Sequence, residues 1–285
     1  MPICRHDQIS GCKALIGFWL ALLTMPTASF AMHVYTMAVV PQVTPVEIAQ
    51  RWAPLLGRLE KETGESFQLR LTDRIPAFEK DFLAGLPDFV FLNPYHAVMA
   101  AKAQGYIPLV RGGEPLTGQL IVDRQGPYRK LADLAGKTIA FPAPNAFGAS
   151  LYMRALLTER EQLAFTPVYV GTHQNVYRSV VKGEAAAGGG VESTLERESP
   201  ALRSRLAVIY TTPGAPPHPL AAHPRVPKAV RDRVVAVILR LQADPEGRKL
   251  LASVDLGGAM PADYARDYAP LERLGLQRHA ETVPR

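Results

Sequence analysis

Short apolar segments alternate with amphipathic segments along most of this chain, and this alternation constrains its fold more than any other feature. Runs rich in β-branched, aromatic and aliphatic residues predict strands, whereas apolar residues at every third or fourth position predict helices. Strands that alternate with helices favour parallel sheets with helices packed on both faces. The sequence therefore predicts an α/β protein.

The expected strands fall into two groups along the chain. The first group is expected at Val34–Val40, Phe67–Leu71, Asp88–Leu92 and Ile107–Val110. The second begins near Leu120 and continues with Thr138–Phe141, Thr166–Val170, Ala185–Ala187 and Leu206–Thr211. A chain of 285 residues can bury two modest cores or one large core.

The expected helices begin at residues with capping chemistry. Thr44 suits an N-cap, Pro45 suits the first helical position, and Glu47 can close a capping box. Asn93 has the N-cap role before the next long helix. Further helices are expected at Pro76–Leu83, Ala146–Leu157, Asn175–Val181, Glu192–Glu198 and Tyr264–Leu274, from Pro227 to Leu241, and around Leu250.

Two segments, near Thr117-Gly118 and at Pro213–Pro217, separate the two groups of strands. We expect two doubly wound lobes joined by a hinge of two chain crossings. Lobe 1 then comprises residues 32–117 plus 214–285, and residues 118–213 form lobe 2 as an insertion. The alternative is one continuous doubly wound domain.

The first 31 residues have the pattern of a secretory signal peptide. Arg5 and Lys13 precede the apolar run Ala14–Leu23, and Ser29-Phe30-Ala31 has small residues at the two positions that signal peptidase requires. We expect cleavage after Ala31 and a periplasmic location. The alternative is a membrane anchor, although this run is short for a bilayer and no later segment is long and apolar enough to span one.

Both cysteines of the chain, Cys4 and Cys12, lie in this leader. Ile9–Cys12 resembles a lipoprotein box, but the apolar run follows the cysteine where it should precede it. The mature chain would therefore contain no cysteine, which excludes disulfides, thiolate catalysis and cysteine–metal ligation.

The formal charge of +6 becomes +5 once Arg5, Lys13 and Asp7 are removed with the leader. A mildly positive field favours anionic ligands, although it is also compatible with an ordinary solvated surface. Basic residues are not clustered with aromatic residues, so the sequence indicates no nucleic-acid binding.

Four turns that follow expected strands carry residues suited to an anion. In α/β sheets, ligands bind beyond the carboxyl ends of strands, beside helix N-termini with free N–H groups. At the first turn, Tyr95 and His96 can each donate a hydrogen bond to an oxyanion. The alternative is that Asn93 only caps and Tyr95 packs.

The second turn, Phe141–Ser150, combines two prolines with small residues that let a ligand approach the backbone. An asparagine can cap the following helix, its first N–H groups can form an anion-binding nest, and the nearest hydroxyl belongs to a serine. The candidate ligand residues are Asn145, Ala146, Phe147, Gly148 and Ser150. The alternative is a structural proline turn.

The third and fourth turns lie in the second group of strands. His173 follows the strand Thr166–Val170, where it can contact a ligand or serve only the structure. Gly188–Gly190 is expected to follow a strand, with Gly189 and Gly190 allowing close backbone approach to a ligand. A plain tight turn is the alternative, and no Gly-Lys-Ser/Thr follows as in a nucleotide P-loop.

Catalytic and metal-binding patterns are not supported. Ser150 lacks the closing glycine of a nucleophile elbow, and the chain contains no HExxH motif. We expect no enzyme activity, no metal and no cofactor. A metal site built from His96, His173 and His218 is the remaining alternative.

Four segments, considered together, resemble the periplasmic phosphate-, phosphite- and phosphonate-binding proteins of ABC transporters. They are Asp88–Tyr95, Leu131–Phe141, Gly171–His173 and Val180–Gly188. The resemblance extends over about residues 34–255 and implies a type II periplasmic-binding-protein fold that grips its ligand between two lobes. It also implies ligand contacts at Tyr95, Asn145–Ser150 and His173.

The chain departs from this family in two places. Pro144–Ala149 lacks the Ser/Thr cluster that the family's phosphonate binders carry, and Ala186 and Gly188–Gly190 replace polar residues near the cleft. These departures disfavour an aminoalkylphosphonate and leave phosphate, phosphite, another oxyanion or a less polar ligand.

We therefore expect a monomeric periplasmic receptor that closes its lobes over a small oxyanion and delivers it to an ABC permease. The alternative is a ligand sensor of the same architecture that docks on the periplasmic domain of a sensor kinase.

Overall fold

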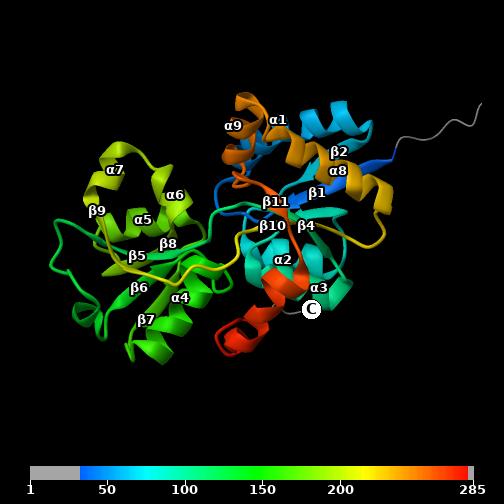
Figure 1. Cartoon of the computed structure of the whole chain (residues 1–285). Helices are drawn as coiled ribbons and strands as arrows, with labels where there is room; N and C mark the ends of the chain where they lie inside the picture. The colour runs from blue at the N-terminus through cyan, green and yellow to red at the C-terminus, as the bar shows by residue number, and fades with distance from the viewer. Residues whose placement is uncertain (1–32, 282–285) are drawn as a thin grey trace, which may run out of the picture. The chain divides into compact units, whose positions relative to one another are not determined.

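Two β-sheets organise the chain in the computed structural model, which describes residues 33–281 (Figure 1). The expected leader, its cleavage point after Ala31 and the two cysteines lie outside the described residues. The expected α/β class is confirmed. None of the helices among the described residues is long and apolar enough to cross a bilayer.

The first sheet has the strand order β11-β4-β10-β3-β1-β2. Its strands are β1 (Val34–Val39), β2 (Ser66–Arg70), β3 (Phe89–Phe91), β4 (Ile107–Arg111), β10 (Pro219–Ala222) and β11 (Met260–Pro261). Strand β1 pairs in parallel with β2 and β3, whereas β10 runs antiparallel between β3 and β4. The sheet is therefore built from two stretches of chain that are far apart in sequence.

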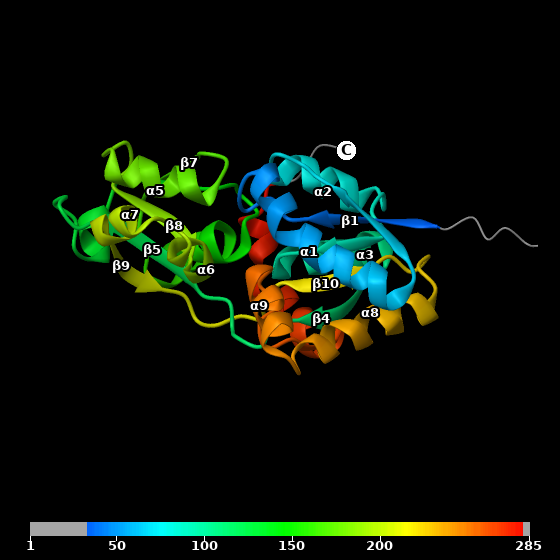
Figure 2. The same cartoon turned by 90° about the horizontal axis from the view of Figure 1, so that it is seen from above.

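Helices cover both faces of this sheet. They are α1 (Pro45–Thr63), α2 (Ile75–Leu83), α3 (Pro94–Gln104), α8 (Lys228–Leu241) and α9 (Pro245–Ser253). Helices α1, α8 and α9 lie on one face, and α2 and α3 lie on the other (Figures 1 and 2). Short helical turns at Tyr264–Tyr268 (η4), Ala269–Leu274 (η5) and Leu276–Arg278 (η6) follow β11.

The second sheet has the strand order β7-β6-β8-β5-β9. Its strands are β5 (Gly118–Asp123), β6 (Thr138–Phe141), β7 (Thr166–Tyr169), β8 (Ala187–Val191) and β9 (Leu206–Thr211). Strand β6 pairs in parallel with β7 and β8, and β5 runs antiparallel between β8 and β9.

Alternate residues of β5 and β6 face two different helical layers. Leu120 and Phe141 pack with a helical run over 147–160, which comprises Phe147–Leu151 (η2), Tyr152–Ala155 (α4) and Leu156–Arg160 (η3). Ile121 and Ala140 pack on the other face with α5 (His173–Val181). The remaining helices are η1 (Leu131–Leu134), α6 (Glu192–Glu196) and α7 (Pro200–Arg205).

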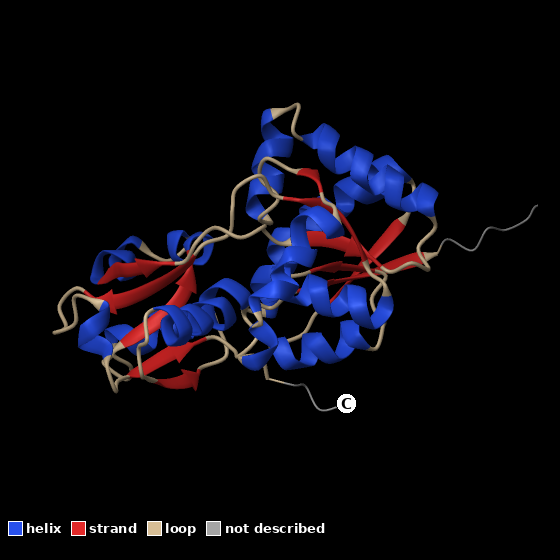
Figure 3. Ribbon diagram, turned by 60° about the horizontal axis from the view of Figure 1, so that its bottom comes forward, coloured by secondary structure: helices blue, strands red, loops and turns tan. Residues whose placement is uncertain are grey.

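Two segments of chain, 112–117 and 212–218, connect the sheets, and they run side by side (Figure 3). Leu116 N–H donates to the Ala215 carbonyl at 2.8 Å, and Ala215 N–H donates back to the Leu116 carbonyl at 3.0 Å. Both connecting segments are therefore tied together by an antiparallel bridge between the lobes.

Local chemistry explains why most helices begin where expected. The Thr44 hydroxyl accepts from Glu47 N–H at 3.4 Å, with Pro45 as the first residue of α1. The Asn93 side chain accepts from His96 N–H at 2.8 Å and begins α3. These two expected caps are confirmed, since each side chain satisfies an N–H group that has no partner within its helix.

Two local expectations were wrong. Asn145 does not cap the run 147–160, because Ala146 holds the N-cap position and no side chain bonds there. The helix expected over Asn175–Val181 begins two residues earlier, at His173. The reason is that Thr172 is the N-cap of α5, and its hydroxyl accepts from Asn175 N–H.

The glycine triplet lies inside β8 and not after it, which corrects the expected strand Ala185–Ala187. A Cβ at Gly188 would lie 2.4 Å from a Val176 methyl group, and one at Gly190 would lie 2.5 Å from the Tyr177 hydroxyl. Glycines in the interior of a strand weaken it and often mark a close approach by another part of the chain. Here they allow helices to approach the centre of the sheet from both faces.

Candidate ligand-binding site

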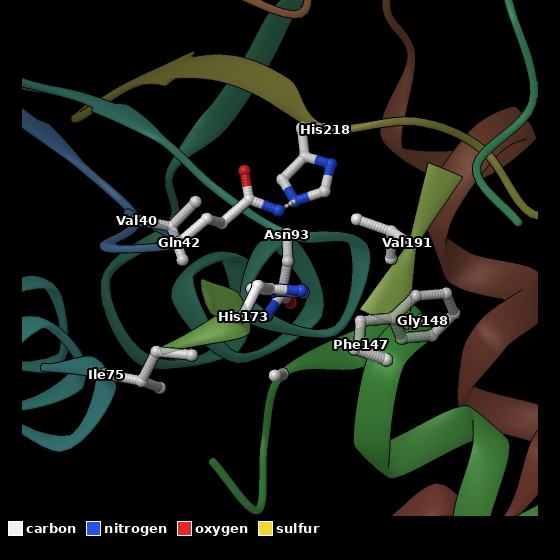
Figure 4. A pocket seen from close by; sticks show the side chains of 11 residues that line it. Val40, Gln42, Ile75, Asn93, Phe147, Gly148, His173, Val191 and His218 are labelled. Carbon is white, nitrogen blue, oxygen red and sulfur yellow. Dashed lines mark hydrogen bonds between the residues drawn. The ribbon is translucent and has the colours of Figure 1, made fainter. Parts of the chain in front are cut away.

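A small buried cavity is lined by residues from the lobe of the first sheet and from the lobe of the second sheet (Figure 4). It is lined by Val40, Gln42, Ile75, Asn93, Ala146, Phe147, Gly148, Ala149, His173, Val191 and His218. We refer to it as the histidine cavity. About 10 Å³ is open to the centre of a water molecule, which is room for about one water. None of these described lining residues is Lys, Arg, Asp or Glu.

Four helices begin at the histidine cavity. Ile75 is the first residue of α2, Asn93 is the N-cap of α3, Phe147 begins the run 147–160, and His173 is the first residue of α5. The first N–H groups of a helix lack partners within the helix, and its N-terminus carries about half a positive charge. The four helix starts therefore create a site that favours negative charge.

The backbone at the start of the run 147–160 provides its own donors. The first bonds of this run are made by Ser150 N–H and Leu151 N–H, which both donate to the Ala146 carbonyl, at 2.8 and 3.0 Å. The N–H groups of the three preceding residues lie ahead of these bonds and along the cavity wall. Gly148 leaves this wall without a side chain, which lets a ligand approach the backbone.

His173 is buried, with 2% of its surface exposed. Its Nδ1 lies 3.2 Å from the Thr194 hydroxyl oxygen, which in turn lies 2.6 Å from the Tyr177 hydroxyl. Burial lowers the pKa of His173 to about 3, and the nearby His218 lowers it further in the same direction. The imidazole is therefore neutral at physiological pH.

His218 enters the cavity from the second connecting segment, just before β10. Its ring stacks on Phe91 with the ring centroids 5.5 Å apart, and its Nε2 lies 3.4 Å from the Gln42 amide nitrogen. Burial lowers the pKa of His218 to about 4, with Asp255 acting in the opposite direction. Two neutral imidazoles therefore face a cavity without charged side chains.

Four residues expected to bind ligand line this cavity: Ala146, Phe147, Gly148 and His173. Gly189 and Gly190 lie within β8, where a Cβ at Gly189 would lie 1.9 Å from the Ala149 carbonyl oxygen. Ser150 is buried and its hydroxyl accepts from Arg154 Nε at 3.2 Å.

Tyr95, His96 and Asn145 lie outside the cavity lining as well. His96 is buried with its Nε2 2.9 Å from a Glu79 carboxylate oxygen. The Asn145 side chain donates to the same Glu79 oxygen at 2.8 Å and to the Glu281 carbonyl at 2.9 Å. Tyr95 packs, half-buried, against the core of the first sheet. Ligand contact by these residues, Ser150 and the two glycines stays a prediction.

Sequence reasoning missed Gln42 and His218 as cavity residues and assigned Asn93 only to capping. Gln42 does carry a usable signal, because it follows the first strand at the carboxyl end of a parallel sheet. His218 was considered only with His96 and His173 as an alternative metal site, because its place depends on how the chain returns from the second sheet. Among the described residues, no group of three or more His, Cys, Asp or Glu side chains is arranged to hold a metal ion.

Two sheets linked by two crossings, with a cavity between them at helix N-termini, define a bilobal periplasmic binding protein of type II fold. Residues 37–268 match the family described as "ABC transporter, phosphonate, periplasmic substrate-binding protein", and the chain belongs to that family. The expected fold class and family resemblance are confirmed. Membership implies a small-molecule ligand, a permease partner and action outside the cytoplasm.

Individual relatives are consistent with this assignment. The chain is 24% identical over 222 residues to the "Phosphate-import protein PhnD" of Mycolicibacterium smegmatis, a match that covers 69% of each protein. PhnD1 of Prochlorococcus marinus in complex with methylphosphonate has a TM-score of 0.78 at 16% identity and covers 86% of this chain and 98% of its own. A binding-protein component of a Pseudomonas aeruginosa phosphonate ABC transporter has a TM-score of 0.75 at 14% identity, covering 87% and 88%. None of these relatives supports the sensor-kinase alternative.

Proposed function

We propose that this protein binds a small phosphorus oxyanion in the histidine cavity and delivers it to an ABC permease without altering it chemically. The observation that carries the proposal is a cavity at four helix N-termini, without charged lining residues and with two neutral imidazoles. Such a site offers N–H donors and a positive helix end to an anion. Phosphate, phosphite and a short phosphonate are the ligands of matching chemistry.

The cavity is small. It has room for about one water molecule, so any of these ligands requires the surrounding lobes to open. The names of two relatives agree with this chemistry, since one is called a phosphate-import protein and the other holds methylphosphonate.

We further propose that residues 1–31 are a cleaved leader and that the secreted protein acts as a monomer. Lobe 1 would comprise 32–117 plus 214–285, with 118–213 as lobe 2. The assignment of the strands to two sheets supports these boundaries, because β5 to β9 all belong to one sheet. A ligand held between the lobes would favour their closure by hinge motion.

Isothermal titration of the purified protein with phosphate, phosphite and methylphosphonate tests the proposed ligand class. We expect binding of at least one of them, and a roughly tenfold weaker affinity in the His173→Ala variant, which loses one hydrogen bond to the ligand. His223→Ala is the matched control, because His223 packs edge-on against Tyr106 and does not line the cavity. Absence of binding to all three anions by the unaltered protein would exclude the proposed ligand class.

A further inference from the structure

The histidine cavity compensates ligand charge with backbone groups and not with charged side chains. Its described lining carries no cationic side chain, and both of its imidazoles are buried. Four helix N-termini supply about half a positive charge each. A buried anion needs compensation by nearby charge or hydrogen bonds, and a second negative charge greatly increases that requirement.

The charged groups packed behind the cavity are already paired. Glu79 lies 2.9 Å from His96 on the α2–α3 side. Arg197 forms an ion pair with Asp255, the carboxylate that acts on His218. Arg154 at the run 147–160 donates to the carbonyls of Pro144 and His279 and lies over the Tyr169 ring. None of these described cations is directed at the cavity to balance a second ligand charge.

The hydrogen bonds around Thr194 favour one tautomer of His173; the Tyr177 hydroxyl also lies 3.5 Å from the Val191 carbonyl, a longer contact than the one it makes with Thr194. The Thr194 hydroxyl oxygen contacts the Val191 carbonyl at 2.9 Å, the Tyr177 hydroxyl at 2.6 Å and His173 Nδ1 at 3.2 Å. A carbonyl can only accept, so the single Thr194 hydrogen must go to Val191 if all three contacts are to be hydrogen bonds. Tyr177 and His173 Nδ1 must then both donate to Thr194.

A neutral imidazole with its proton on Nδ1 has a lone pair on Nε2. Since Nδ1 of His173 is engaged with Thr194, Nε2 is the nitrogen left to serve the cavity, and it can only accept. A fully deprotonated oxyanion offers no hydrogen to this acceptor, whereas a hydrogen-bearing monoanion offers its O–H. The helix N–H groups would bind the remaining oxygens.

We propose that the histidine cavity selects the singly charged, hydrogen-bearing form of its oxyanion, with His173 Nε2 accepting the ligand's O–H. Thr194 is the positioning residue that keeps His173 in the accepting tautomer. This inference rests on the proposed function, because it concerns the same ligand in the same cavity. It adds a specificity that the size and polarity of the cavity do not provide.

The test is the pH dependence of affinity, measured by titration calorimetry with phosphate, phosphite and methylphosphonate. We expect affinity to fall about tenfold per pH unit above the second ionisation of each ligand, because only the monoanion binds. The pH at which this fall begins should differ among the three ligands and follow their own ionisation, which separates ligand titration from titration of the protein. Sulfate, a dianion without O–H at these pH values, should not bind.

Variants of Thr194 test the positioning role. Thr194→Val removes the acceptor of the His173 Nδ1 proton at nearly constant volume. We expect the pH dependence of affinity to flatten, because the tautomer with its proton on Nε2 can then donate to the dianion. Thr194→Ser keeps the hydroxyl and should restore the slope, which a merely structural role would not predict. Thermal unfolding of both variants identifies any loss of folding.

Each outcome is decisive. Binding of any of these anions with an affinity that is constant or rises through the second ionisation would overturn the inference and leave the proposed function intact. The same holds if Thr194→Val, folded and binding, keeps the full slope. If the unaltered protein binds none of the anions at any pH, the proposed function is wrong and the inference falls with it.

Discussion

At the residue scale, three glycines and two histidines show how packing gives ordinary residues specific roles. The glycines of β8 carry no side chain because helices approach the strand from both faces. That closeness brings Tyr177 and Thr194 to His173 from elements on the same side of the sheet. Packing density and the hydrogen-bond network of the cavity are therefore linked.

Gly189→Ala should be strongly destabilising. Its Cβ would lie 1.9 Å from the Ala149 carbonyl oxygen and 2.7 Å from the Phe141 ring, so backbone would have to move. Overpacking of this kind costs about 1–3 kcal/mol or more of the free energy of unfolding, measurable by urea denaturation. Gly57→Ala is the matched control, because nothing lies within 4 Å of its Cβ in α1. It should stabilise by about 0.5–1 kcal/mol, and equal effects of the two substitutions would contradict the packing argument.

At the element scale, the C-terminal helical turns tie the two lobes together. Asn145, at the start of the run 147–160, exchanges two hydrogen bonds with the backbone of Glu281, at 2.9 and 3.0 Å. Arg154, nine residues further along the chain, donates to the His279 carbonyl at 2.7 Å. Asn93 donates to the Asn145 carbonyl at 2.9 Å, which connects this anchor to the start of α3.

Asn145→Ala should lower the free energy of unfolding by about 1–3 kcal/mol, since it leaves a buried Glu79 oxygen and two Glu281 backbone groups without this partner. Asn175→Ala is the matched control, because Asn175 is exposed and its side chain donates to a single described partner, the Val170 carbonyl. We expect the control to change stability by less than about 1 kcal/mol. Similar losses in both variants would show that Asn145 does not connect the lobes.

At the scale of the whole molecule, the site exists because two separate stretches of chain meet. His173 belongs to the second sheet's lobe, and His218 lies on the segment that returns to the first sheet. Both imidazoles are buried and neutral, so global stability depends on the pH at which they would ionise.

Acid should destabilise the protein well before its carboxylates titrate. The folded-state pKa values of His173 and His218 are lowered to about 3 and about 4, below the ordinary value of 6.5. Their contribution to stability is complete above pH 6.5 and is lost as pH falls towards those values, because the unfolded chain binds the protons first. Each should contribute a slope of about 1.4 kcal/mol per pH unit in this window. Urea denaturation between pH 7 and 5 measures it; a His218→Gln variant with an unchanged slope would contradict this prediction.

The sequence by itself determined the α/β class, the caps at Thr44 and Asn93, and the strands Thr138–Phe141 and Leu206–Thr211. It also singled out His173 and Ala146–Gly148, which line one cavity. Those features depend on local periodicity, on capping chemistry, and on motifs that the family shares. Such signals are contained within a few neighbouring residues.

Only the tertiary structure decided that Gly188–Gly190 form a central strand, that Asn145 bonds to Glu79 and Glu281 instead of capping a helix, and that His218 joins His173 at one cavity. The physical reason is the same in each case. Packing distances and hydrogen-bond partners depend on segments far apart in sequence, and no local pattern records which segments meet.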